Sequence, residues 1–429
     1  MIGTLLITLM LLFLAAGIPI VFAIGLASLA GVMTLSNVPL IVIPNRMFNG
    51  MDSFPLMAIP FFLLAGELMN VAGITVRIVH FANALVGHIR GGLAHANIVA
   101  SMFFAGITGS ALADAAAIGS ILIPAMKKEG YDEDFSAAVT ASAALMGPII
   151  PPSITMVIFG VTAGVSIGAL FMAGFVPGVL IALCLMAVAY VIARRRNYPK
   201  ASQMVTGREF LLRFKDAFLA LLTPLIILGG ILGGVMTPTE SAAVAVFYAL
   251  FLGIFVFRTL TWRQVPHLLL KTGIVTGFIM IIVGAANVFA WLLAAEQVPQ
   301  HLSNFFLTIS RKPWVVLLVI NIFLLIVGCL MDTSAAIIIL VPVLMPLITS
   351  VGIDPLHFGL VMCINLILGM ATPPFGVILF LVCNITKMTM ERLIRAIWPF
   401  LLVEVAILLL VTYLPGIALV VPRMFGLAK

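Results

Sequence analysis

The chain has 429 residues, of which 63% are hydrophobic and 9% are charged, and its formal net charge is +7 at pH 7. A soluble globular domain is nearer to half apolar and a quarter charged, so this composition excludes an ordinary soluble protein and indicates a multi-pass membrane protein. The basic excess does not indicate nucleic acid as a partner, because the Lys and Arg residues stand between apolar segments, as in cytoplasmic loops.

Apolar segments of helical length follow one another from the N-terminus. The first is expected to stay as a membrane span, because it has neither a basic start nor a small-residue cleavage site. Residues 52–69 belong to a third, long span. A re-entrant helical hairpin is predicted over about 93–126, with its tip near Gly109. A broken helix follows over about 135–164, interrupted at GPIIPPS, and a last span ends near residue 193.

The most polar stretch, residues 194–216, is predicted to be a cytoplasmic linker. Beyond it the order of elements recurs within residues 217–429. A second hairpin is predicted over about 314–348, and a second broken helix over about 356–386, interrupted at GMATPP. Residues 1–193 and 217–429 are therefore interpreted as two copies of one unit.

Matched residues support this duplication. Asp114 pairs with Asp332 at an offset of 218 (332 − 114), and Gly147 pairs with Gly369 at an offset of 222 (369 − 147). The offsets differ by four, which predicts a link four residues longer in the second copy. Three further pairs follow the same two offsets: Pro124 with Pro342, Pro151 with Pro373, and Pro152 with Pro374.

The charges of the loops predict the orientation of the chain in the membrane. The hairpin arms are read as about 15 residues long, short of the roughly 20 that cross a bilayer, so each hairpin is expected to re-enter the side it left. An odd number of crossings per copy then makes the two repeats inverted. With the linker inside, 17 of the 22 Lys and Arg residues fall on the cytoplasmic side, in agreement with the positive-inside rule. The five outside are Arg46, Arg311, Lys312, Arg423 and Lys429.

The breaks carry the predicted chemistry. Unwound backbone at membrane depth survives only where protein or water covers it, and its free carbonyl oxygens suit Na⁺. Hydroxyl oxygens of Ser110, Thr333, Ser334 and Thr372 stand beside these breaks. Helix N-termini at the same places point N–H groups toward an anion. Asp114 and Asp332 lie in apolar segments, which favours a functional role for them, although each has a simpler interpretation as a helix cap.

Several segments together resemble the large membrane subunit of the tripartite ATP-independent periplasmic (TRAP) transporters. They are DSFPLMAIPFFLLAGELM from Asp52, GSALADAAAIGSILIPAM from Gly109, GPIIPPSITMVIFG from Gly147, TPTESAAVA from Thr237, and DTSAAIIILVPVLMPL with ATPPFG in the second half. The resemblance covers nearly the whole chain. It implies an all-α polytopic fold with two inverted-topology repeats and an elevator-type transport mechanism.

The same resemblance implies a function and partners. An organic acid such as a C4-dicarboxylate, sialic acid or sugar acid is delivered by a periplasmic binding protein and imported with Na⁺ as the coupling ion, without another cofactor. A small four-helix membrane subunit is expected as a separate chain, in the bacterial inner membrane. By position, the implied sodium ligands are Gly109, Ser110, Asp114, Gly147, Ile150, Gly328, Asp332, Thr333, Ser334, Gly369 and Thr372. The implied substrate site is Ser110, Pro152, Ser153, Thr155, Thr372 and Pro374.

Two other classes of membrane protein are the alternatives. A cation/proton antiporter also has inverted repeats and buried acids, but it would place paired acids on crossing helices near a Lys, and no intramembrane Lys is predicted here. An integral-membrane enzyme would need clustered His, Glu or Cys in the membrane, and the sequence offers none. Glu67 and Glu240 are either proton carriers or residues at the ends of spans.

Overall fold

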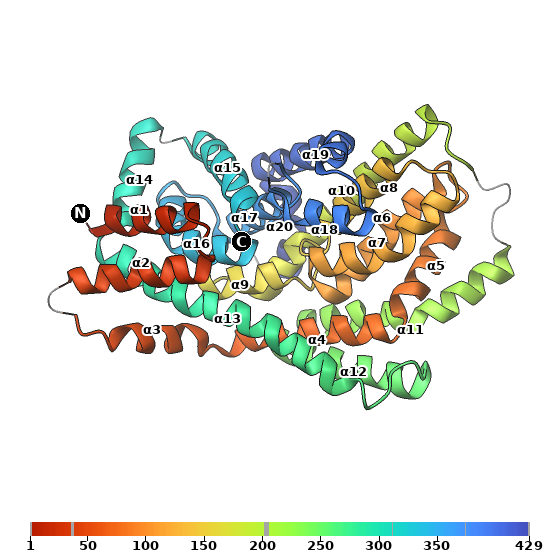
Figure 1. Cartoon of the computed structure of the whole chain (residues 1–429), viewed down its shortest axis with the longest axis horizontal. Helices are drawn as coiled ribbons and strands as arrows, with labels where there is room; N and C mark the ends of the chain where they lie inside the picture. Colours follow the sequence, from red (N-terminus) through yellow and green to blue (C-terminus); the bar gives the residue numbers. More distant parts are fainter. Residues whose placement is uncertain (1, 36–37, 201–205, 311, 374, 428–429) are drawn as a thin grey trace.

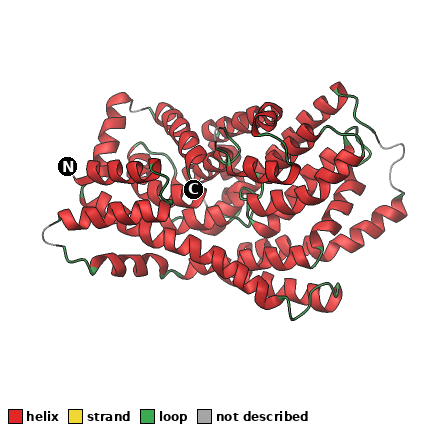
Figure 2. Ribbon diagram, viewed as in Figure 1, coloured by secondary structure: helices red, strands yellow, loops and turns green. Residues whose placement is uncertain are grey.

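The computed structural model describes residues 2–35, 38–200, 206–310, 312–373 and 375–427. Across these residues the chain is helical, without a β-strand (Figure 2). Eight of the described helices are long and apolar enough to cross a membrane. This confirms the prediction of an all-α polytopic membrane protein.

The described residues of the first half form ten α-helices and one short 3₁₀ helix. They are α1 (Ile2–Ala15), α2 (Ile20–Thr34), α3 (Val42–Met51), η1 (Phe54–Met57), α4 (Ala58–Val71), α5 (Ile74–Val86), α6 (Gly92–Thr108), α7 (Ala111–Lys128), α8 (Glu133–Ala144), α9 (Ile154–Ala163) and α10 (Ile167–Arg195).

In the described residues of the second half, the helices follow a similar order. They are α11 (Gly207–Leu232), α12 (Pro238–Phe251), the π-helical turn η2 (Leu252–Val256), α13 (Val265–Ala295), α14 (Val298–Ile309), α15 (Pro313–Leu330), α16 (Thr333–Ser350), α17 (Pro355–Gly369), α18 (Val377–Thr386), α19 (Met390–Tyr413) and α20 (Pro415–Met424).

The helices form two layers (Figure 1). Helices α1–α4 and α11–α13 pack on one another and run along one side of the molecule; we call them the frame. Helices α6–α10 and α15–α20 form the second layer, which we call the hairpin body. Within each half, α5 or α14 joins the frame to the body.

The hairpins and broken helices appear as helix pairs close to their predicted bounds. Helices α6 and α7 meet at Gly109–Ser110, and α15 and α16 meet at Met331–Asp332. Their arms have 17, 18, 18 and 18 residues, more than the predicted 15, because helical structure continues up to the tips. Both arms of the second hairpin are long enough to cross a bilayer, so arm length does not support re-entrance there. The re-entrant path and the inversion of the repeats stay predictions.

The structure gives a different alignment of the two repeats from the one obtained by matching residue types. Helices α7 and α16 both have 18 residues and begin 222 positions apart (333 − 111), and Ser110 and Asp332 cap their N-termini. The counterpart of Asp332 is therefore Ser110, at an offset of 222 (332 − 110), rather than Asp114. Pro124 corresponds to Pro346 at the same offset (346 − 124). The prediction that the link between the hairpin and the break is four residues longer in the second copy is wrong. The single offset of 222 fits both the second arm of the hairpin and the start of the broken helix.

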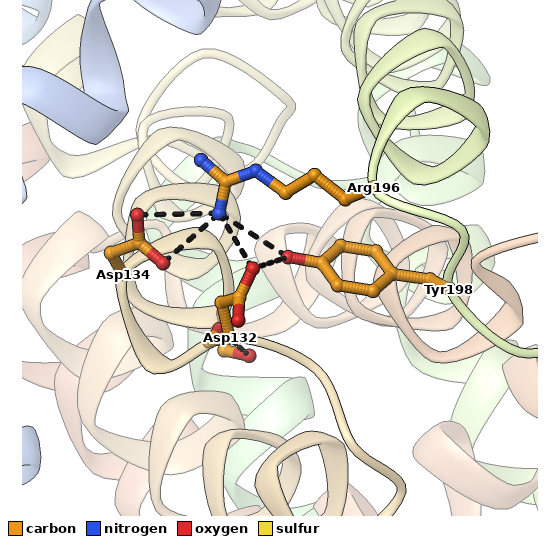
Figure 3. A network of polar contacts seen from close by, with 5 residues as sticks. Asp132, Asp134, Arg196 and Tyr198 are labelled. Atoms are coloured by element: carbon orange, nitrogen blue, oxygen red, sulfur yellow. Dashed lines mark hydrogen bonds and ion pairs between the residues drawn. The ribbon is translucent and has the colours of Figure 1, made fainter.

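The junction between the repeats begins with a polar network on the hairpin body (Figure 3). Helix α10 ends at Arg195, and the Arg196 guanidinium lies 2.9 Å from Asp132 and 3.1 Å from Asp134. The Tyr198 hydroxyl donates to Asp132 Oδ2 at 2.7 Å. Since α11 begins at Gly207, the second part of the predicted 194–216 linker belongs to a frame helix.

Burial and the bond to Asp132 raise the pKa of Tyr198 to about 12, so its hydroxyl remains a donor at neutral pH. The bond from Tyr198, together with Arg196, lowers the pKa of Asp132 below its usual 3.8. A carboxylate with a lowered pKa in the folded state stabilises the fold above its ordinary pKa and loses that contribution as the pH falls through the lowered value. The network is therefore complete at physiological pH and fails only in acid, as the pH falls through the lowered pKa of Asp132.

Replacing Tyr198 with Phe tests this network. The ring contacts with Tyr131 and Phe135, at centroid distances of 4.8 and 5.0 Å, are retained while the bond to Asp132 is lost. We expect the free energy of unfolding to fall by about 1 kcal/mol, measured by thermal unfolding in detergent. Tyr413→Phe is the control, because its exposed hydroxyl makes only a 3.4 Å bond. Equal shifts for the two variants would show that the Asp132 bond adds nothing.

Candidate functional site

A cavity of about 430 Å³ lies between the frame and the hairpin body. The frame contributes an apolar wall, most of it from one side of α13. The body contributes both hairpin tips and parts of both helix breaks. The frame residues are Ile20, Leu63, Ile274, Val275, Phe278, Ile279 and Ile282; the body residues are Gly109, Ser110, Ala111, Leu112, Pro148, Ile154, Thr155, Asp332, Thr333, Ser334 and Met370.

The polar wall of the cavity is built from helix N-termini. Ser110 caps α7 by accepting from the Ala113 N–H at 3.4 Å. Asp332 caps α16 by accepting from the Ser334 and Ala335 N–H groups at 2.8 and 3.4 Å. Thr155 lies in the first turn of α9. Helix N-termini carry partial positive charge and free N–H groups, so the wall suits a carboxylate although no Lys or Arg is among the residues lining this cavity.

The first hairpin tip is packed directly on the first break. Gly109 has φ of +60°, a conformation that favours glycine, and a Cβ there would lie 2.6 Å from the Pro152 carbonyl oxygen. A Cβ at Gly147 would lie 3.1 Å from the carbonyl of Ser110. Both glycines thus let two unwound backbones approach, which places main-chain oxygens close together.

The second tip and the second break meet in the same way. A Cβ at Gly369 would overlap the backbone of Gly328, 2.6 Å from its Cα. The Cys329 thiol lies 3.0 Å from the carbonyl oxygens of both Thr372 and Pro373. Two carbonyls of the break therefore converge on the first arm of the hairpin.

The structure brings only part of the predicted site to the cavity. Gly109, Ser110, Thr155, Asp332, Thr333 and Ser334 line it. Ser153 is buried as the cap of α9, accepting from the Met156 N–H at 3.2 Å. Thr372 lines a smaller cavity beside Cys329 and Pro373. The predicted residues Asp114, Gly147, Ile150, Pro152, Gly328 and Gly369 are not among the residues that line it, and Pro374 lies outside the described residues. Ile150 lines a separate cavity between α6, α10 and α11.

Asp114 occupies a separate position inside the first hairpin. Its side chain is 0% exposed, and among the described residues neither carboxylate oxygen has a hydrogen-bond partner. The polar side chain that acts on it is Ser101 on the opposite arm, whose hydroxyl also has no partner in the described part of the chain. Its counterpart in the second repeat, at an offset of 222, is Ala336, so this carboxylate belongs to the first hairpin alone.

Sequence reasoning missed two features. Lys271 of α13 forms an ion pair with Glu67 of α4 at 2.7 Å. The sequence predicted Lys271 in a cytoplasmic loop, whereas it belongs to a frame helix. The pair was missed because the partners are 204 residues apart. The apolar cavity wall of α13 was missed because the helix is apolar on all sides, which leaves no sequence signal for the side that faces the cavity.

Long apolar helices, two hairpins and a cavity at their tips define a multi-pass membrane protein of the transporter type. The family model described as "Tripartite ATP-independent periplasmic transporter, DctM component" matches residues 7–417. The chain therefore belongs to the TRAP transporter family, as a large membrane subunit. Its matched relatives are transporter permease subunits, which confirms the interpretation as a transporter rather than an enzyme.

The similarity to characterised relatives extends over whole chains. The sialic acid TRAP transporter large permease protein SiaM of Vibrio cholerae is 44% identical over 415 residues, covering 96% of both chains. The C4-dicarboxylate TRAP transporter large permease protein DctM of Pseudomonas aeruginosa is 41% identical over 406 residues, covering 95% of both. Among solved structures, the Alcanivorax borkumensis YdaH transporter shares the fold, with a TM-score of 0.63 and 14% identity over 91% of this chain and 90% of that one.

Proposed function

We propose that this chain is the permease subunit of a Na⁺-coupled symporter that imports an organic acid into a bacterial cell. The relatives whose names give a substrate include sialic acid and C4-dicarboxylate permeases. A periplasmic binding protein delivers the acid, and a small membrane subunit completes the tripartite complex in the inner membrane. The hairpin body carries the acid past the frame in an elevator-type movement.

The observation that carries this proposal is the cavity between the two hairpin tips. Its polar wall includes the N-terminal turns of α7 and α9, which suit the carboxylate of an organic acid, whereas the N-terminus of α16 is already capped by Asp332. Ser110 and Thr155 supply hydroxyl groups for the same ligand. Of the remaining predicted substrate residues, Ser153 caps α9, and Pro152 and Thr372 belong to the two breaks.

Sodium is proposed to bind where each tip meets its break. The first site takes carbonyl and hydroxyl oxygens from Gly109, Ser110, Gly147 and Ile150, and the second takes them from Gly328, Thr333, Ser334, Gly369 and Thr372. Close backbone approach at Gly109 and Gly369 supports both sites. Asp332 at the second tip adds one negative charge, whereas Asp114 acts on the first site from within the hairpin.

Reconstitution tests the proposal. The two membrane subunits are placed in liposomes with the binding protein outside, and radiolabelled sialic acid and a C4-dicarboxylate are the probes, with calorimetry on the binding protein showing which one it holds. We expect uptake of that acid only with an inward Na⁺ gradient and only with the loaded binding protein. Equal uptake without Na⁺, or without the binding protein, would refute the mechanism.

A cation/proton antiporter is the second candidate, and the Glu67–Lys271 pair on crossing frame helices is the observation that favours it. This mechanism predicts proton release when Na⁺ is added to the reconstituted subunits without any organic acid. A pH-sensitive dye inside the same liposomes reports that release. Symport of the acid with Na⁺ moves no proton, so it predicts no dye response when Na⁺ is added alone.

A further inference from the structure

The first hairpin tip is held between two helices of the frame. The last turn of α6, which ends at Thr108 beside the tip, contacts α4 on one side and α11 on the other. Gly66 of α4 faces Thr108, and Gly106 of α6 faces Pro224 of α11. Leu63, one turn before Gly66, lines the cavity, so the first contact lies at the cavity's edge. A glycine thus stands on one side of each contact.

Neither contact has room for a methyl group. A Cβ at Gly66 would lie 3.0 Å from Thr108 Cγ2 and 3.3 Å from Thr108 Cα. At Gly106 a Cβ would lie 2.9 Å from Pro224 Cγ and 3.1 Å from Pro224 Cβ. Two carbon atoms attract best at about 3.5–4.0 Å, so the hairpin or the frame has to shift slightly to admit even alanine at either position.

Two glycines of the frame lie in open space instead. Among the described residues, Gly229 of α11 and Gly277 of α13 have no atom within 4 Å of a Cβ built on them. Glycine is a poorer helix former than alanine, and small residues in membrane helices are typical of places where helices pass closely. The glycines at 66 and 106 are therefore explained by the approach of the hairpin, and those at 229 and 277 serve as controls.

The second hairpin lacks the same contact at its tip. Leu330, the counterpart of Thr108 at an offset of 222 (330 − 108), is 60% exposed, whereas Thr108 is 3% exposed. The end of the first arm is thus covered by α4 and α11 in the first hairpin, whereas the frame meets the second hairpin through α13 and α16. A body that moves relative to its frame exchanges such contacts between its two positions.

We propose that Gly66 and Gly106 are positioning residues that let the first hairpin tip slide past α4 and α11 during transport. This inference rests on the proposed symport by movement of the hairpin body. A methyl group at either residue destabilises the present location of the hairpin body relative to the frame, or obstructs the movement of the body between its two locations. It leaves the cavity wall itself unchanged, since neither glycine lines the cavity.

The test compares Gly66→Ala and Gly106→Ala with the control Gly277→Ala in the reconstituted tripartite complex. The initial rate of Na⁺-driven uptake is measured against the concentration of loaded binding protein, with sialic acid or a C4-dicarboxylate as the probe. We expect the maximal rate to fall about tenfold or more in both glycine variants, with the half-saturating concentration unchanged. The control should transport like the wild type.

A rescue variant shows whether the loss arises at the contact with the hairpin tip. Thr108→Ser removes Cγ2, the atom nearest to the added methyl, so Gly66→Ala with Thr108→Ser should recover most of the rate. Wild-type rates in both glycine variants, or a loss that Thr108→Ser fails to restore, would overturn the inference alone. Absence of Na⁺-dependent uptake by the wild type would overturn the proposed function and this inference together.

Discussion

Replacing Gly369 with alanine is expected to lower Na⁺-driven uptake by roughly 100-fold, which corresponds to about 3 kcal/mol of overpacking. The added Cβ would overlap the backbone of Gly328 at the point where the second hairpin tip meets its break. A backbone cannot relieve this overlap by changing a rotamer, so the tip must move away and the proposed sodium ligands separate. The measurement is the initial rate of uptake in proteoliposomes as a function of Na⁺ concentration.

The control for this variant is Gly277→Ala, in which the new methyl meets no atom within 4 Å. Gly328→Ala is the partner variant, because its Cβ would lie 2.9 Å from the Leu366 carbonyl oxygen on the same contact. We expect Gly369→Ala and Gly328→Ala to insert and elute as the wild type does, while both need more Na⁺ for half-maximal uptake. An unchanged Na⁺ dependence in Gly369→Ala would remove the second tip and break from the sodium site.

Replacing Asp332 with alanine is expected to reduce Na⁺-dependent uptake by about 10- to 100-fold, the range for losing a hydrogen-bonded charged group. This carboxylate faces the cavity and caps α16 through two N–H groups. Its loss therefore removes both a negative charge from the second tip and a helix cap. The cap alone contributes about 1 kcal/mol to stability, so the protein should still fold.

Asp332→Ser separates the two effects. Serine keeps an oxygen that can cap α16, as Ser110 does for α7 in the first repeat, but it carries no charge. If the charge matters for the ion, Asp332→Ser transports as poorly as Asp332→Ala and unfolds at the wild-type temperature. If only the cap matters, Asp332→Ser restores uptake. Wild-type sodium dependence in Asp332→Ala would exclude Asp332 from the ion site altogether.

The helix order and the positions of the breaks were predictable from the sequence. Apolar segments of helical length, interrupted by Gly and Pro, are local signals that do not depend on distant residues. For this reason the predicted hairpin over 93–126 lies within α6 and α7, and the predicted hairpin over 314–348 lies within α15 and α16. The family resemblance followed from the same segments and is confirmed by the match over residues 7–417.

The alignment of the repeats was only partly predictable. Asp114 and Asp332 share a residue type, and sequence comparison therefore paired them. The structure pairs Asp332 with Ser110 instead, because both cap the second arm of a hairpin. A cap is defined by backbone conformation, which allows Ser and Asp equally, so residue identity could not reveal the correspondence.

The sequence by itself determined that this is a helical membrane protein with two similar helix breaks, since hydropathy and helix-breaking residues act over short stretches of chain. Only the tertiary structure decided which residues face the cavity. Ser110 and Thr155 line it, Asp114 is enclosed within its hairpin, and the apolar wall comes from α13. The physical reason is that the side a helix presents depends on its rotation against neighbours far away in the chain, as the approach of Gly369 to Gly328 illustrates.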